Sequence, residues 1–176
     1  MNKYIRMIHI RNASEADFPI IQEIAQKTWP NTFSAILSPG QISYMLDMMY
    51  STDSLINQTI RNGHRFLLAY LQECTGSDVC VGYASYELNY SGEKRTKIHK
   101  IYILPNNQGE GTGMALINKI EEIAAACDDH KLFLNVNKSN PAVSFYKKLG
   151  FEIIKEEKIS IGNGFFMDDY VMQKCI

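Results

Sequence analysis

A glycine-rich turn between an apolar segment and a helical pattern is the feature that most constrains the fold. Residues 101–104 are apolar, residues 108–113 read Gln-Gly-Glu-Gly-Thr-Gly, and apolar residues at helical spacing continue to about residue 127. A strand that passes through such a turn into a helix leaves backbone N–H groups unpaired at the positive end of the helix dipole. The sequence therefore predicts an anion site at this turn, most simply for a phosphate group.

Size and composition predict one globular domain that spans residues 1–176. The chain is 45% hydrophobic and 21% charged, and its formal net charge of -1 gives no electrostatic reason to expect nucleic acid or an anionic membrane surface as a partner. No apolar run approaches the ~20 residues that span a membrane, and the N-terminus lacks the apolar core of a signal peptide. We therefore expect no membrane contact and a cytoplasmic location.

The four cysteines show none of the spacings that identify zinc sites or redox motifs. Cys74, Cys80, Cys127 and Cys175 form no C-x-x-C pair, so we expect no bound metal. Cys74 and Cys80 are near enough in sequence to face each other across a turn. In a reducing compartment, free thiols are favoured over a disulfide.

Alternation and helical spacing predict a mixed sheet with helices on both faces. Helices are expected to follow the capping residues Asp17, Ser38, Ser51 or Thr52, and Asn140, and another spans residues 110–127. Antiparallel strands come before and after one β-α-β unit. The predicted fold class is α/β (α+β), with a mixed, mostly antiparallel central sheet of about seven strands. These strands cover residues 4–11, 65–71, 79–88, 96–104, 131–136, 151–159 and 165–172.

The sequence predicts where the first helix begins and ends, and it leaves open the function of the segment 44–50. Pro19 is tolerated only in a first turn, which favours Asp17 over Ser14 as the cap of the first helix. Trp29-Pro30 is expected to end that helix, because a proline inside a helix removes a hydrogen bond. Residues 44–50 are rich in methionine and tyrosine, and they are either a wall of a binding site or the packing surface of two short helices.

Two common nucleotide-binding motifs do not fit the glycine turn. A P-loop needs Gly-Lys-Ser or Gly-Lys-Thr where this chain has Gly113-Met114-Ala115. The dinucleotide fingerprint G-x-G-x-x-G requires an acidic residue ~20 positions later, whereas the spacing here is G-x-G-x-G and the region around Phe133 offers no such acid. An ordinary mononucleotide site stays as one possibility.

The pattern that does fit is Q-x-x-G-x-G followed by a second signature. Gln108, Gly111 and Gly113 form the first block. After one predicted helix and one strand, the second block contains Asn140, Ala142, Tyr146, Gly150 and Phe151. In this order the two blocks resemble the GNAT superfamily of acetyl-CoA-dependent N-acetyltransferases. The resemblance covers residues 96–176 well and the first half of the chain in its order of elements, and it extends to small bacterial members, some of which acetylate polyamines or other small amines.

This resemblance implies the GNAT fold, acetyl-CoA as co-substrate, and transfer of its acetyl group to a primary amine of a small molecule or peptide. Direct attack in a ternary complex is favoured over an acyl-enzyme, because no cysteine falls in the matched motifs. A protein of a different class, a catalytically inactive CoA-binding sensor or regulatory module, stays as the alternative. The last strands are able to form the edge of a homodimer, as in many relatives, but nothing in the sequence requires it.

The resemblance also implies where acetyl-CoA binds. The backbone of residues 101–103 pairs with the amides of the pantetheine arm, so side-chain identity matters little there. Glycines in the turn allow the backbone angles and the close approach that a pyrophosphate needs. Asn140 either caps its helix only or also bonds the pantetheine. The implied cofactor-binding residues are Ile101, Tyr102, Ile103, Gln108, Gly109, Glu110, Gly111, Thr112, Gly113, Asn137 and Asn140.

Tyr146 is the strongest candidate for the chemistry that the resemblance implies. Transfer of acetyl to an amine expels the CoA thiolate, and a positioned hydroxyl is able to protonate that sulfur. The alternative for Tyr146 is a structural tyrosine at the edge of the core.

The base that takes the proton of the amine stays open between two residues. Glu87 lies late in its strand, beside the presumed cofactor strand. His99 lies on the cofactor strand and has the same side-chain parity as Ile101 and Ile103. Each is also compatible with a solvated strand residue.

Two further positions bear on the acceptor amine. Many relatives carry a glutamate near the position of Lys97, and its absence here puts a carboxylate base at that place in doubt. Asp168 and Asp169 on the last strand either attract a cationic amine or, as is more common for paired acids beside a turn, face solvent.

Overall fold

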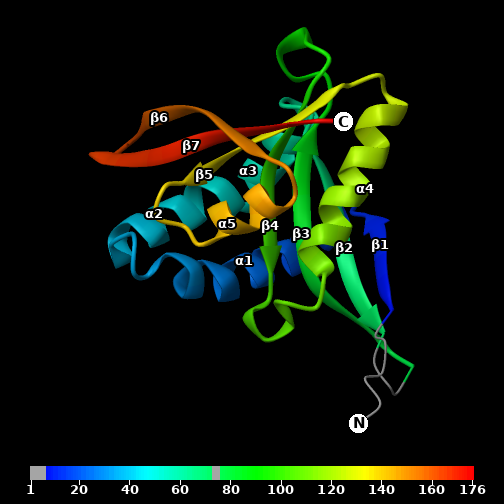
Figure 1. Ribbon diagram of the computed structural model, residues 1–176. Coiled ribbons are helices and arrows are strands. Elements are labelled where there is room, and N and C mark those ends of the chain that lie inside the picture. The colour runs from blue at the N-terminus through cyan, green and yellow to red at the C-terminus, as the bar shows by residue number, and fades with distance from the viewer. Residues whose placement is uncertain (1–6, 73–75) are drawn as a thin grey trace.

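A seven-stranded sheet runs through the part of the chain that the structure, a computed structural model, describes, namely residues 7–72 and 76–176. The strands lie in the order β1-β2-β3-β4-β5-β7-β6, and β4 with β5 is the parallel pair among antiparallel neighbours (Figure 1). This confirms the predicted mixed, mostly antiparallel sheet. The strands are β1 (Ile8–Asn12), β2 (Arg65–Gln72), β3 (Asp78–Glu87), β4 (Thr96–Ile103), β5 (Lys131–Asn137), β6 (Glu152–Gly162) and β7 (Phe165–Cys175).

Helices cover both faces of the sheet, as predicted. One hydrophobic core, called here the α1 core, lies under α1 (Phe18–Phe33), α2 (Pro39–Tyr50) and α3 (Thr52–Ile60). The other, the α4 core, lies under α4 (Thr112–Ala126) and α5 (Ala142–Lys148) (Figure 1). None of the helices in the described residues is long and apolar enough to cross a membrane. Short 3₁₀ turns connect the elements at Glu15–Asp17, Tyr90–Gly92 and Pro105–Asn107.

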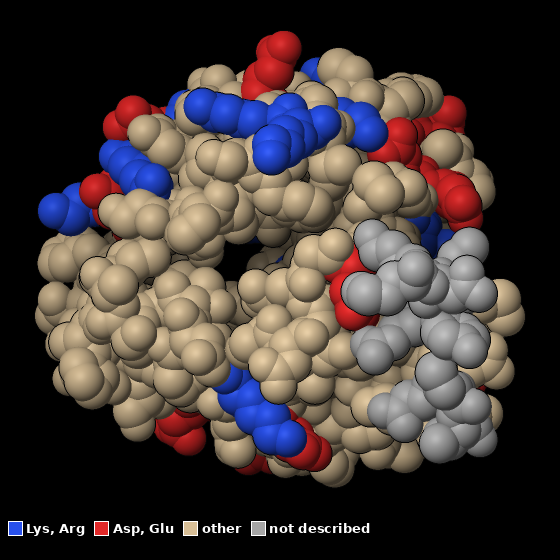
Figure 2. All heavy atoms as spheres, turned by 60° about the horizontal axis from the view of Figure 1, so that its bottom comes forward, with Lys and Arg blue, Asp and Glu red and all other residues tan. Residues whose placement is uncertain are grey.

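The parallel pair β4/β5 is short, and the two strands then separate. Their register joins Thr96 to Leu132, Lys97 to Phe133 and Ile98 to Leu134, and it ends there. Beyond this point β4 keeps β3 as its neighbour, while β5 continues beside β7. A cleft opens between the separated strands. Figure 2 shows a hollow at the centre of one face, bordered by residues that are neither basic nor acidic.

A β-bulge in β4 changes the direction of His99 from the predicted one. Ser85 pairs with Lys100 and Tyr86 with Ile98, so His99 is the extra residue. Ile98 and Ile101 consequently both join the α4 core. His99 instead stacks on His64, with ring centroids 3.8 Å apart, on the face of the α1 core. The predicted shared parity of His99 with Ile101 is therefore wrong, because simple alternation does not survive a bulge.

Helix α1 does not end at Trp29-Pro30, as the sequence predicted, but continues to Phe33. Pro30 removes one backbone hydrogen bond of the helix. Trp29 and Phe33 offset this loss, since both are buried and their rings contact each other and Tyr102. Burial of two aromatic side chains in the α1 core outweighs one missing hydrogen bond.

The C-terminal hairpin of β6 and β7 closes against α2. Its turn has positive φ at Gly162, Asn163 and Gly164. Tyr44 of α2 donates a hydrogen bond from its hydroxyl to the carbonyl of Ile161 (2.8 Å). The hairpin and α2 therefore form one side of the cleft.

The cysteine predictions are partly outside the described residues. Cys74 lies there, so its pairing with Cys80 stays untested. Cys80, Cys127 and Cys175, the described cysteines, form no disulfide with one another.

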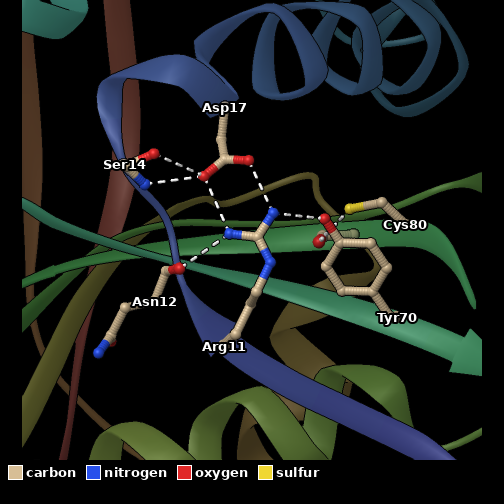
Figure 3. Close-up of polar contacts among 7 residues, drawn as sticks. Arg11, Asn12, Ser14, Asp17, Tyr70 and Cys80 are labelled. Atoms are coloured by element: carbon tan, nitrogen blue, oxygen red, sulfur yellow. Dashed lines mark hydrogen bonds and ion pairs between the residues drawn. The ribbon is translucent and has the colours of Figure 1, made fainter.

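Asp17 does not cap α1 with its side chain, as the sequence predicted, but links the start of α1 to β1. Its carboxylate accepts hydrogen bonds from the Ser14 backbone N–H (2.8 Å) and from both terminal nitrogens of Arg11 (2.7 and 2.9 Å). Figure 3 shows Arg11 bridging Asp17 and the hydroxyl of Tyr70. The Arg11 guanidinium, followed by the Ser14 N–H, holds the pKa of the Asp17 carboxyl well below its usual range.

This network makes a prediction about acid stability. Because the folded-state pKa of Asp17 is lowered, its stabilisation is present above the unfolded pKa and is lost as pH falls below about 4. Asp17→Asn should lower the free energy of unfolding at pH 7 by about 1–2 kcal/mol, a value reduced for the 40% exposure of Arg11, and should flatten the acid-induced loss.

The measurement is urea unfolding of both proteins between pH 3 and 7. Glu23→Gln, which removes an exposed ion pair with Lys27, is the control and should change stability by less than about 0.5 kcal/mol. Equal effects of the two substitutions would contradict the assignment.

Candidate active site

The cleft between the separated β4 and β5 has a volume of about 900 Å³. Among the described residues, its lining contains all of the predicted cofactor-binding residues except Glu110. Of the predicted catalytic residues, Tyr146 and His99 line it and Glu87 does not. The structure therefore brings most of the predicted residues into one site.

The glycine turn is shaped by backbone angles at two positions. Gly109 and Gly111 have φ of 80° and 88°, which side chains with a Cβ rarely adopt. A Cβ at either position would meet nothing within 4 Å, so conformation and not space demands glycine there. At Gly113 the reason differs, because a Cβ would lie 3.2 Å from the ring of Phe145 and would push α4 away from α5.

The turn presents polar groups that suit an anion. Gly111 is the N-cap of α4, so the first N–H groups of this helix have no partner within it. The side chain of Gln108 holds the turn to the end of β4 by donating to the Ile103 carbonyl (3.1 Å). The Thr112 hydroxyl is buried and forms no hydrogen bond with any described residue. A buried hydroxyl without a partner at a helix N-terminus fits a phosphate-bearing ligand.

The separated strand edge provides the second part of a cofactor site. Residues 99–103 of β4 have β3 on one side and no β5 register on the other. Their backbone groups on that side are able to pair with the amides of an extended ligand. The pantetheine arm of CoA has this form, so the residues present fit the predicted cofactor.

Two asparagines beside α5 are engaged in local hydrogen bonds. Asn140 accepts from the Ala142 N–H through Oδ1 (2.9 Å), so its capping function is confirmed. Asn137 accepts from the Ser139 N–H in the same way (2.9 Å). Both line the cleft. Contact of either residue with the cofactor stays a prediction.

Tyr146 is held in the second turn of α5 at the edge of the α4 core. It is 9% exposed, and its ring contacts Phe145 and Phe151. Burial raises the pKa of its hydroxyl to about 12. The hydroxyl therefore remains protonated at neutral pH and is available as a proton or hydrogen-bond donor.

Glu87 and His99, the two base candidates, form a pair. The Nε2 of His99 lies 3.0 Å from Oε2 of Glu87, and the His64 ring on which His99 stacks bonds Ser85 through Nδ1 (3.2 Å). Burial, then the stacked His64 and nearby lysines, lowers the pKa of His99 to about 2. Because His99 is neutral, its Nε2–H donates to Glu87.

The ligating atoms of His64, Glu87 and His99 lie within 4.8 Å of one another, a grouping able to hold a metal ion. Lys97 and Lys100, however, lie near enough to lower the pKa values of the two histidines. Their positive charge opposes a cation at this place, so we assign no metal here.

Lys100 is a buried cation that the sequence reading did not identify. It is 5% exposed, its Nζ donates to Oε1 of Gln58, and it lies over the rings of Tyr50 and Phe66. Burial lowers its pKa to about 7, so the Lys100 amine is neutral in about half of the molecules at neutral pH. Its position between Ile98 and Ile101 in a strand beside the predicted cofactor site is the signal that could have identified it.

Asp169 is also at the cleft, and the structure separates it from its neighbour Asp168. Asp168 is exposed and pairs with Lys138 (2.7 Å), whereas Asp169 is 1% exposed. In β7 its position follows the alternation of Met167 and Val171, whose side chains face the cleft or the interior. Strand parity was therefore the signal for burial.

The methionine- and tyrosine-rich segment serves both purposes that the sequence left open. Met45 is buried in the α1 core and also lines the cleft, and Met49 lines the cleft as well. Tyr50 is fully packed, where it accepts hydrogen bonds from Tyr83 (2.7 Å) and Trp29 (3.3 Å).

Comparison with known proteins agrees with this site. A sequence model of the acetyltransferase (GNAT) family matches residues 19–151. The chain is 26% identical over 147 residues to a spermidine N(1)-acetyltransferase of Thermoplasma acidophilum, covering 83% of this chain and 89% of that protein. It is 28% identical to an L-methionine sulfoximine/L-methionine sulfone acetyltransferase of Pseudomonas aeruginosa, covering 82% and 80%.

Solved structures share the fold. The PaiA N-acetyltransferase of Thermoplasma acidophilum, in complex with coenzyme A, has a TM-score of 0.77 at 23% identity and covers 97% of this chain and 99% of its own. A GCN5-related N-acetyltransferase of Rhodopseudomonas palustris has a TM-score of 0.79 at 20% identity, with both chains covered fully.

The unpaired Thr112 hydroxyl gives a prediction that separates stability from binding. The free energy of unfolding of the ligand-free Thr112→Val protein should equal that of the unmodified protein or exceed it by up to about 1–2 kcal/mol. The reason is that burying an unpaired hydroxyl is unfavourable. The same change should weaken acetyl-CoA binding by about tenfold.

Thr28→Val is the matched control, since Thr28 is equally buried but its hydroxyl donates to the Ile24 carbonyl (2.8 Å). This control should lose stability and keep its affinity. Thermal unfolding and calorimetric titration with acetyl-CoA measure both quantities. A Thr112→Val protein that loses stability but binds normally would refute the ligand role.

Proposed function

The chain belongs to the acetyltransferase (GNAT) family, and from this premise we propose that its cleft holds acetyl-CoA and a primary amine together. Family membership shows that the protein is an acyltransferase that takes acetyl from acetyl-CoA and passes it to an amine. The names of its relatives include acceptors of different kinds, a polyamine and amino-acid derivatives. These names do not identify the acceptor of this chain, so its chemical class has to be inferred from the residues of the site.

The observation that carries the proposal is the cleft where β4 and β5 separate above the glycine turn. The turn 108–113 and the start of α4 would hold the pyrophosphate, and the free edge of residues 99–103 would hold the pantetheine. These two places lie at the cleft in the order in which the groups occur along CoA.

Tyr146 is proposed as the donor to the departing sulfur. Its raised pKa keeps the proton on the hydroxyl until negative charge develops on the thiolate. None of the described cysteines lines the cleft. That supports direct attack of the amine on the thioester, with no acetyl-cysteine on the way.

The difference in pKa between the amine and a candidate base bears on which residue takes the proton. An amine with a reference pKa of about 10.4 must lose a proton, and the pKa of His99 is lowered to about 2. A gap of about eight units corresponds to about 11 kcal/mol, which is a large barrier for direct proton transfer. Glu87 does not line the cleft. Both residues stay predictions, and the numbers weigh against His99 as the direct proton acceptor.

The test of the function is acetyl transfer to a panel of polyamines, amino acids, peptide N-termini and aminoglycosides. We expect release of CoA together with an acetylated product for at least one class. Binding of acetyl-CoA with transfer to none would favour a sensor module, and displacement of CoA by ATP would favour a mononucleotide site. The single-domain organisation, the cytoplasmic location and a homodimer stay predictions.

Tyr146→Phe should lower turnover by about 100-fold while the dissociation constant of acetyl-CoA changes less than about twofold. The reason is that the hydroxyl acts on charge that exists only during transfer. Steady-state kinetics and calorimetry measure the two quantities.

Tyr86→Phe is the control, because Tyr86 is a buried tyrosine of the same α4 core that does not line the cleft. It should retain turnover. Normal turnover of the Tyr146 variant would remove Tyr146 from the chemistry.

A further inference from the structure

The cleft contains a buried carboxylate whose charge the described residues leave unpaired. Both side-chain oxygens of Asp169 are buried and form no hydrogen bond with any described residue. An ionised carboxylate in this condition is strongly unfavourable, so native proteins seldom keep one without a purpose. A cation bound in the cleft would remove the penalty.

The electrostatic surroundings of Asp169 do not supply that cation. Burial, followed by the negative charges of Asp168 and Glu157, raises its pKa to about 6, and Lys138 and Lys97 counteract this in part. Lys138 is occupied by Glu156 and Asp168 (2.7 Å each). Lys97 lies over the rings of Tyr90 and Phe133. Nearby cations therefore act on Asp169 only at a distance.

Asp169 lies near the proposed chemistry. It is paired in the sheet with Asn137, at the end of β5 where the cleft is open. Tyr102 of β4 is close enough to both Tyr146 and Asp169 for each of them to raise the pKa of its hydroxyl. Asp169 and Tyr146 thus line the same cleft, and each lies within electrostatic reach of Tyr102.

The lining of the cleft combines apolar side chains with neutral polar ones such as Asn31, Asn135 and Asn137. Five of its apolar side chains, called here the apolar wall, are Trp29, Phe33, Met45, Met49 and Met167. Among the described residues that line the cleft, Asp169 is the only acidic one. Lys100 also lines the cleft, and since its pKa is about 7 it is positively charged below that pH. A ligand with several positive charges would find one carboxylate among these lining residues, and Lys100 would repel its other charges.

We propose that Asp169 binds the ammonium group of the acceptor, and that the acceptor is a monoamine with an apolar or aromatic substituent, not a polyamine. Because this nitrogen is also the nucleophile, the ammonium first passes one proton to the Asp169 carboxylate. The neutral amine then attacks the thioester carbonyl, and the C–S bond breaks to release CoA. The substituent packs on the apolar wall, where it loses contact with water and gains dispersion contacts. This proposal rests on the proposed acetyl transfer and specifies its acceptor. Asp169 is then a specificity-determining residue.

The first experiment compares three amines with the unmodified protein at saturating acetyl-CoA. These are 2-phenylethylamine (one charge, apolar), ethanolamine (one charge, polar) and spermidine (three charges). We expect kcat/KM for 2-phenylethylamine to exceed that for each of the others by at least about tenfold. A preference for spermidine or ethanolamine would overturn the proposal and leave acetyl transfer itself intact. Transfer to no amine, with acetyl-CoA bound, would overturn both.

The second experiment uses Asp169→Asn. For 2-phenylethylamine we expect KM to rise by about 100-fold, and the affinity for acetyl-CoA to change less than about twofold. Asp168→Asn is the matched control and should change KM less than about twofold, because Asp168 is exposed and pairs with Lys138. An unchanged KM in the Asp169 variant would refute the ammonium site.

A stability measurement separates recognition from a structural role. Replacing an unpaired buried carboxylate by a neutral amide should raise Tm, whereas loss of a structural carboxylate would lower it. The folded-state pKa of Asp169 is raised, so the wild-type protein should lose stability as pH rises from about 4 to 6, and the variant should lack this part of the slope. A lowered Tm together with a normal KM would contradict the proposal. If the variant does not fold, the amine preference of the unmodified protein still decides.

Discussion

The pairing of β4 with β5 extends over three residues, and the rest of the site depends on this short contact. Past Ile98 the two strands are no longer paired, while β4 stays beside β3 and β5 stays beside β7, and the cleft lies between them. The glycine turn continues from one separated strand and α5 follows the other. The same divergence thus supplies a free backbone edge, a helix N-terminus and a tyrosine around one space.

Low polarity inside the cleft determines what its few polar groups are able to do. Burial raises the pKa of Tyr146 and keeps its proton in place, and it lowers the pKa of Lys100 so that this cation costs less to bury. It also leaves Asp169 as an unfavourable charge that a ligand can pair. The two bundles of packed side chains, the α1 core and the α4 core, hold these groups rigidly. The unpaired carboxylate of Asp169 lowers the stability of the ligand-free protein, and the same carboxylate allows the cleft to recognise a cation.

The parts of the site that were predictable from sequence are those set by local chemistry. The turn 108–113 could be found because glycine at a helix start needs no knowledge of the sheet, whereas Tyr146 was proposed because it stands in the second signature of the family resemblance. His99 was misplaced because a bulge depends on how β3 pairs with β4. Pro30 was misread because burial of its aromatic neighbours is a tertiary effect. Asp169 was undervalued because the alternation of Met167, Asp169 and Val171 indicates a shared face but does not indicate that β7 lies inside the sheet, between β5 and β6.

Hydrogen exchange of backbone amides in the presence and absence of CoA tests the central claim most directly. If CoA pairs with the free edge of β4 and its pyrophosphate lies on the glycine turn, exchange slows at residues 99–103 and 109–114. Amides of β1 and β2, at the far edge of the sheet, should keep their rates. Unchanged exchange at both segments while CoA is bound, or protection confined to other elements, would contradict the account.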